Sequence, residues 1–151
     1  MSPQQRNIGK IRSGTPAELT DVIGIGTGSH RYEVTFRGPG AHSFEGFGQA
    51  SAIHAMGRVI ARIGDIRTPA DPKTTFTVGT VSGGTSVNTI AGDAKMQIDI
   101  RSNAMPQLLA AEKEVLATIQ AGVDDENRRW GMEGDRRIVA TVKPIGDRPA
   151  G

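Results

Sequence analysis

The segment from residue 30 to residue 37 alternates strictly between apolar and polar side chains, and this feature constrains the fold most. Tyr32, Val34 and Phe36 fall on one face of an extended chain, while charged and hydroxyl side chains fall on the other. A period of two is that of a strand with one face buried and the other in water. Since such a strand is stable only within a sheet covered on one side, the chain must supply further strands and a layer that packs on them.

The next segments switch between the two periods. Gly38-Pro39-Gly40 breaks the first strand, and residues 49–63 then carry apolar side chains three and four positions apart, which predicts an amphipathic helix. Residues 74–81 and 94–101 are rich in β-branched or alternating apolar side chains and predict two strands. A loop that contains Gly83-Gly84 joins them.

The C-terminal third again predicts a helix that is followed by a strand. Residues 106–122 predict a second helix, with Pro106 in its first turn and Gly122 at its C-terminus. Residues 123–135 are polar and predict a loop. Alternation over residues 138–142 predicts a last strand, which ends before Pro144 and Gly146. Near the N-terminus, residues 19–25 indicate a shorter strand only weakly, because glycine interrupts them.

The expected order of strand, helix, strand, strand, helix, strand is that of a split βαβ, or ferredoxin-like, α+β fold. Two helices would cover the apolar face of a four-stranded antiparallel sheet whose other face is polar. A chain of 151 residues, 36% of them hydrophobic, suits one domain. Residues 1–14 are expected to be a tag, a linker or a stub of a preceding domain, which leaves residues 15–151 for the fold.

Charge and composition argue against several classes of function. The formal net charge is only +2, so the chain is not expected to bind nucleic acid. The chain has no cysteine, which excludes disulfides and thiolate metal sites. No apolar run is long enough for a membrane span and the N-terminus lacks a secretion signal, so a cytoplasmic protein without membrane partners is expected.

No complete hydrolytic or metal site is predicted from the residues alone. His30 and His54 are interpreted as surface or partly buried polar residues, and no histidine has a partner at metal-ligand spacing. His42 follows a glycine-rich turn, and Phe44 and Phe47 can anchor the loop that carries it, so it is either a functional residue or incidental to the turn.

Two further residues are candidates for binding. Asn88 ends a glycine-rich loop that lacks the spacing of a phosphate-binding loop, and its amide can bind a ligand or cap the loop. Arg101 ends a strand, and its planar guanidinium can bind a carboxylate or form an ion pair with Asp99 or another neighbour.

Five segments follow one another in the chain as successive motifs. They are Gly28-Ser29-His30-Arg31-Tyr32, Arg37-Gly38-Pro39-Gly40-Ala41-His42-Ser43, Gly83-Gly84-Thr85-Ser86-Val87-Asn88-Thr89-Ile90, Asp99-Ile100-Arg101-Ser102 and Ile145-Gly146-Asp147-Arg148-Pro149-Ala150-Gly151. Read together, they resemble the dimerisation (lid) domain of the di-zinc metallopeptidases that include aminoacylases, glutamate carboxypeptidases, acetylornithine deacetylase and succinyl-diaminopimelate desuccinylase. The resemblance covers about residues 20–151.

The resemblance implies one domain of a longer, metal-dependent peptidase or amidohydrolase that forms a homodimer. Its catalytic domain, absent here, would hold zinc and the general base, so this chain alone would contain no cofactor and be inactive. His42 matches the lid histidine that stabilises the transition state in the partner subunit's site, and Asn88 and Arg101 match substrate-binding residues. Ala91 departs from the family, which usually has proline there.

Two other functions are open to a split βαβ domain. A nucleic-acid-binding module would need aromatic side chains and a basic stripe on the exposed sheet face. The side chains expected there are of mixed character: Arg31, Glu33, Thr35, Lys95, Gln97 and Asp99. A small-molecule regulatory domain of the same architecture is the other alternative.

Overall fold

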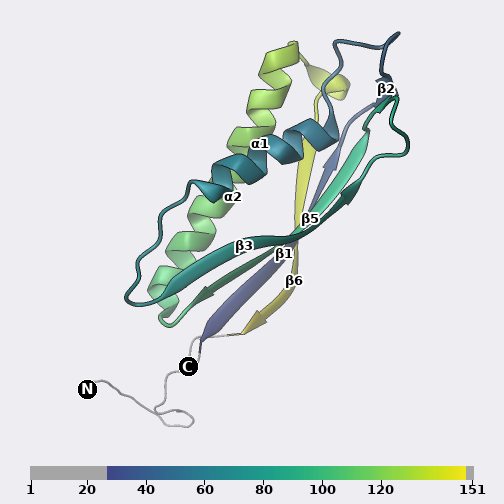
Figure 1. The fold of residues 1–151 in the computed structure, drawn as a ribbon. Helices are drawn as coiled ribbons and strands as arrows, with labels where there is room; N and C mark the ends of the chain where they lie inside the picture. The colour runs from purple at the N-terminus through teal and green to yellow at the C-terminus, as the bar shows by residue number, and fades with distance from the viewer. Residues whose placement is uncertain (1–26, 149–151) are drawn as a thin grey trace, which may run out of the picture.

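The computed structural model describes residues 27–148, and within them the split βαβ fold is confirmed. The expected tag or linker at residues 1–14 and the weak strand at residues 19–25 lie outside the described residues. Four long antiparallel strands form one sheet in the order β3-β5-β1-β6 (Figure 1). They are β1 (Gly28–Arg37), β3 (Thr74–Gly83), β5 (Asp93–Ser102) and β6 (Val139–Arg148).

Two helices, α1 (Ala52–Gly64) and α2 (Met105–Trp130), cover one face of this sheet (Figure 1). The core between the layers includes Val34, Phe36, Met96, Ile98 and Ile100, all at most 2% exposed. These are the apolar positions of the strand alternation, so the period of two placed the sheet's buried face correctly. The opposite face of the sheet is polar, as expected.

The structure corrects the end of the second helix. Residues 123–130 were expected to be loop, but α2 continues through them and ends at Gly131, which has a positive φ of 65°. Two of their polar residues face inward: Glu126 is fully buried, and the Asn127 amide exchanges two hydrogen bonds with the backbone of Ile138 at 2.7 and 2.9 Å. The polarity of these two residues therefore marks buried hydrogen bonding and not a solvent-exposed loop.

Gly122 does not end a helix but lies where the two helices come closest. A Cβ at this position would lie 2.9 Å from the backbone nitrogen of Val59 in α1. The glycine is required for close packing, not for a left-handed turn.

The last strand is also longer than expected. β6 continues through Pro144 and Gly146 to Arg148, with a register shift against β1 near Tyr32. Proline is tolerated because β6 is an edge strand, whose outward N–H groups have no strand partner within the sheet. The first helix begins at Ala52, slightly later than expected, because the Ser51 side chain caps it by accepting a hydrogen bond from the His54 N–H.

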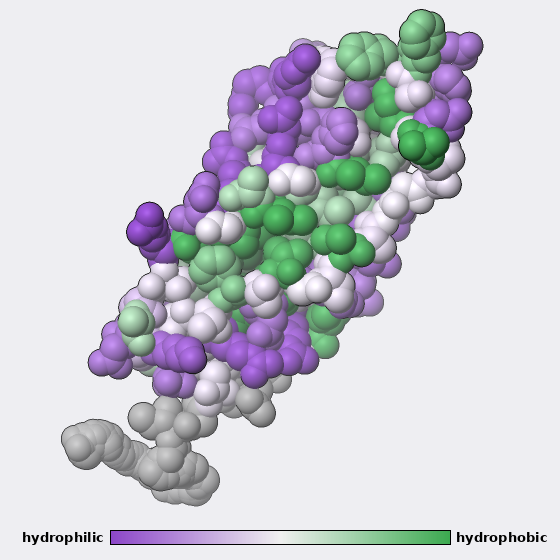
Figure 2. All heavy atoms as spheres, viewed as in Figure 1, coloured by the Kyte–Doolittle hydropathy of each residue, from purple (hydrophilic) through white to green (hydrophobic). Residues whose placement is uncertain are grey.

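Apolar side chains gather on the surface formed by α1 and β3 (Figure 2). Ile53 and Val81 are 39% and 57% exposed, and Ile60, Phe76 and Val78 are partly buried there. Neither helix of the described residues has the length and apolar character needed to cross a membrane.

Candidate functional site

A two-stranded sheet brings the His42 and Asn88 loops together. β2 (Ala41–His42) pairs antiparallel with β4 (Thr89–Ile90), so that His42 lies opposite Thr89. The Ser43 N–H donates to the Asn88 carbonyl at 3.0 Å. Gly40 makes the turn into β2 with φ of 71°, and a Cβ there would lie 3.2 Å from the Ile90 carbonyl oxygen. The glycines before His42 therefore let two backbones approach, as the sequence suggested.

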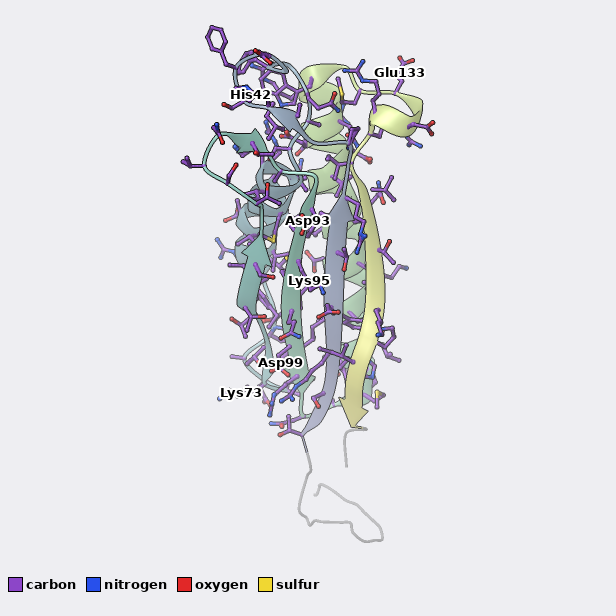
Figure 3. The ribbon with its side chains drawn as sticks, turned by 90° about the vertical axis from the view of Figure 1, so that its right-hand side faces the viewer. His42, Lys73, Asp93, Lys95, Asp99 and Glu133 are labelled. Carbon is purple, nitrogen blue, oxygen red and sulfur yellow. The ribbon has the colours of Figure 1, made fainter. Side chains whose placement is uncertain are left out.

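The hydrogen bonds of the His42 ring determine which nitrogen carries its proton. Nδ1 accepts from the Phe44 N–H at 3.2 Å and more weakly from the Glu45 N–H at 3.5 Å. A ring nitrogen that accepts is unprotonated, so the proton of the neutral ring is on Nε2. The side chain is exposed at the end of the molecule (Figure 3). His42 thus presents an N–H donor to the surface at this end of the domain.

The base of the His42 loop is attached to α2 and the turn after it. Phe47 packs edge to face on Trp130, with ring centroids 5.3 Å apart. The Gln49 amide donates a hydrogen bond to the Arg136 carbonyl at 3.1 Å and accepts one from the Arg136 guanidinium at 2.8 Å. Phe47 is 75% exposed but makes the expected anchoring contact through Trp130, whereas Phe44 is 87% exposed and has no aromatic partner among the described residues.

A cleft of about 330 Å³ lies beside these loops, between them and the start of α1. Its lining is largely apolar but includes hydroxyl groups. The lining residues include Ser43, Phe47, Ile53, His54, Thr89 and Trp130. Val87, next to Asn88, is fully exposed at the same end. The tip of the domain therefore carries apolar side chains around two polar candidates.

Arg101 lies elsewhere, on the polar face of the central strand β5. Its Nε–H donates to Oδ2 of Asp99 at 2.7 Å, and Arg31 on β1 donates through Nε–H to Oδ1 of the same carboxylate at 2.8 Å. Burial raises the pKa of Asp99, but the hydrogen bonds and positive charges of Arg101 and Arg31 outweigh it and hold the pKa below its usual 3.8. The ion pair with Asp99 that the sequence left open is present.

The structure separates Arg101 from the other two candidates. His42 and Asn88 lie beyond the Asp93 end of β5, and Arg101 is eight positions further along the strand. At about 3.4 Å per residue this is about 27 Å. Figure 3 shows His42 and Asp99 at opposite ends of the sheet. No small substrate can touch His42 and Arg101 of the same domain at once.

The described residues contain no group of three or more His, Cys, Asp or Glu side chains able to hold a metal ion. His30 is half-buried and its Nδ1 lies 2.9 Å from Glu112 of α2, while His54 is exposed on α1. Both match the interpretation as ordinary polar residues. The ion pair between Arg31 and Asp99 was not predicted from the sequence, although the strand alternation places both side chains on the polar face of the sheet.

Several solved structures share this fold. They include a hydantoinase/carbamoylase family amidase from Burkholderia ambifaria (TM-score 0.67, 19% identity, covering 83% of this chain and 29% of that one). Aminopeptidase PepT from Bacillus cereus has a TM-score of 0.64 and 18% identity, covering 80% of this chain and 30% of that one. An aminobenzoyl-glutamate utilization protein from Klebsiella pneumoniae has a TM-score of 0.66 and 15% identity, covering 93% and 35%.

The chain spans about a third of the length of these proteins. Comparison with curated protein sequences gives no match. Residues 27–131 match the family described as the peptidase dimerisation domain. The chain belongs to this family of peptidase dimerisation domains.

Proposed function

We propose that this domain joins two copies of a metal-dependent peptidase or amidohydrolase and completes the partner subunit's active site with His42 and Asn88. The observation that carries the proposal is the pairing of β2 with β4, which sets these two residues side by side at one exposed end. Arg101, at the other end, binds the carboxylate of the substrate. In this proposal zinc is held by a catalytic domain of the longer enzyme; the described residues include no group of three or more His, Cys, Asp or Glu side chains that could hold a metal ion.

The surface made by α1 and β3 supports self-association. β3 is an edge strand with neither proline nor charged residues, so its outer backbone groups can pair with another strand. Both edge strands have one register shift against their inner neighbour, but the other edge, β6, also carries Lys143 and Pro144, which oppose pairing. The apolar side chains of α1 beside β3 would be buried in the same contact.

A two-fold axis perpendicular to the sheet would pair β3 antiparallel with its copy. Thr74 of one strand then lies toward Gly83 of the other, and each protomer is reversed end to end relative to its mate. His42 and Asn88 of one protomer come to the same end of the joined sheet as Arg101 of the other. Arg101 is about 27 Å from His42 and Asn88 within one domain, so a site that uses all three residues would have to be shared between the two subunits.

The chemistry assigned to His42 follows from its ring. An Nε2–H donor aimed at the carbonyl oxygen of a scissile bond stabilises the negative charge that develops there, an effect of a few kcal/mol for one well-placed donor. The Asn88 amide offers both donors and an acceptor to the same substrate. The exposed Phe44 and Val87 would be covered when the tip meets the partner's catalytic domain.

The test mixes two inactive variants of the full enzyme under conditions shown to exchange subunits. One carries His42→Ala and the other lacks a zinc ligand in the catalytic domain. Random exchange makes about half of the dimers mixed, and each mixed dimer has one intact site, so about a quarter of wild-type activity should return. Exchange without any recovery of activity rules out the action of His42 across the interface.

A further inference from the structure

The polar face of the sheet carries two arginines on one carboxylate. Arg31 lies directly opposite Asp99 in the antiparallel register of β1 and β5, and Arg101 is two positions along β5 on the same face. Each guanidinium donates its Nε–H to a different oxygen of Asp99, at 2.8 and 2.7 Å. The cluster holds two positive charges and one negative charge, so one positive charge is not neutralised within it.

Both guanidiniums keep most of their donors. A guanidinium has five N–H donors, and a carboxylate can occupy at most two of them in a fork, so at least three remain on each arginine. Among the side chains that the structure describes, neither arginine is hydrogen-bonded to any acceptor besides Asp99. The Arg31 and Arg101 side chains are 51% and 38% exposed, so the remaining donors are open to a ligand.

The neighbouring strands leave the cluster accessible and do not neutralise it. Thr75 and Thr77 of β3, which are exposed, face Arg101 and Asp99 across the strand pair. On the other side, Gly146 of β6 lies opposite Arg31 and presents no side chain. The next carboxylate along this face, Glu33, lies near Lys95 and accepts a hydrogen bond from Gln97. In the described part of the chain, no second acidic group therefore competes for the two arginines on this part of the face.

We propose that Arg31 is a second carboxylate-binding residue of this domain, which acts with Arg101 on the same carboxylate group of the substrate. Asp99 holds the two guanidiniums at a fixed spacing on adjacent strands. Two arginines offer a carboxylate charge-assisted hydrogen bonds from both sides, and their planar groups are oriented before the substrate arrives. The substrate class is therefore an amide or peptide with a free carboxylate, which rests on the proposed role of Arg101.

A second cluster in the same chain provides a matched control. Asp125 on α2 is also held by two arginines, Arg62 and Arg128, and Arg62 and its aspartate are about as exposed as Arg31 and Asp99. Arg62 donates to one oxygen through both Nε at 2.8 Å and Nη2 at 2.6 Å. The Asp125 cluster has the same charge as the Asp99 cluster, but it lies on the two helices and not on the polar face of the sheet.

The experiment follows the arginine Nε–Hε signals of the whole chain by NMR during titration with sodium acetate, with sodium chloride as the ionic-strength blank and acetamide as the neutral analogue. The Arg31 and Arg101 signals are expected to move together on one saturating curve with acetate. The Arg62 signal should move no more than in the chloride blank. Acetamide should shift none of the three.

Three variants complete the test, and amide spectra are recorded to check that each one is folded. Arg31→Ala is expected to weaken acetate binding at Arg101 several-fold, Arg31→Lys to restore only part of it, and Arg62→Ala to leave it unchanged. If Arg101 binds acetate equally well without the Arg31 guanidinium, the inference about Arg31 is wrong while the role of Arg101 stands. If neither signal responds beyond the Arg62 signal, the carboxylate role of both arginines fails.

Discussion

Replacing Glu126 with alanine should destabilise the domain strongly. The carboxylate is fully buried and accepts from the Ser51 N–H at 2.9 Å, the Arg58 Nε–H at 2.8 Å and the Trp130 Nε1–H at 3.0 Å. These bonds tie the start of α1, and with it the His42 loop, to the end of α2. Hydrogen bonds to a charged group contribute about 1.5–3 kcal/mol each, and a buried N–H left without a partner costs about 1–3 kcal/mol.

The bonds are not additive, because the Arg58 side chain is 41% exposed and regains water when its partner is lost. We therefore expect Glu126→Ala to lower the free energy of unfolding by about 3 kcal/mol, measured by urea denaturation with far-UV circular dichroism. The adjacent Asp125 is the control, since it also pairs with an arginine of α1 but lies at the surface. Asp125→Ala should cost less than about 1 kcal/mol. Equal costs for the two variants would refute the assignment of Glu126 as the buried anchor.

Three further predictions concern the interface, the helix crossing and the sheet. Val81→Glu on β3 should shift the monomer–dimer equilibrium toward monomer in sedimentation experiments. Val139→Glu on β6, a position of similar exposure, should leave that equilibrium unchanged. Equal effects of the two variants would contradict pairing through β3. Gly122→Ala should lower the free energy of unfolding by about 1–3 kcal/mol, because the added carbon overlaps α1. Gly57→Ala is the control, since no atom lies within 4 Å of the added carbon. Measured on the monomer at low protein concentration, this control should not lower the free energy of unfolding. In an NMR titration the pKa of the Asp99 carboxyl should lie below 3.8, its usual value. The contribution of this carboxylate to stability is therefore present above pH 3.8 and is lost as the pH falls through the lower folded-state pKa. Replacing both Arg31 and Arg101 should raise this pKa, and an unchanged pKa would contradict the ion-pair network.

Much of the fold follows from local periodicity. The alternation of Tyr32, Val34 and Phe36 identified the buried sheet face, because a strand's side chains point to opposite faces whatever the strand pairs with. The resemblance of short segments also identified the family, whose model matches residues 27–131. Four of the five segments lie within this range and form turns and strand ends of one domain. Both kinds of signal are carried by residues close together in the chain.

Local periodicity failed where a polar residue has a distant partner. Glu126 and Asn127 indicated a loop, and only the packing of α2 against α1 and β6 shows that they are buried and hydrogen-bonded. Gly122 likewise indicated a helix end, since the sequence does not show that Val59 lies against it. In each case the partner is more than ten positions away, beyond the reach of a local pattern.

The arrangement of the candidate site was decided by tertiary structure alone. The sequence by itself determined that His42, Asn88 and Arg101 belong to motifs of one domain, because their types and order along the chain carry the resemblance. The pairing of β2 with β4 decided that the first two lie together, and the length of β5 decided that Arg101 lies at the other end. The antiparallel register decided that Arg31 shares Asp99 with Arg101, because a register joins residues far apart in the chain and is set by the packing of the whole sheet.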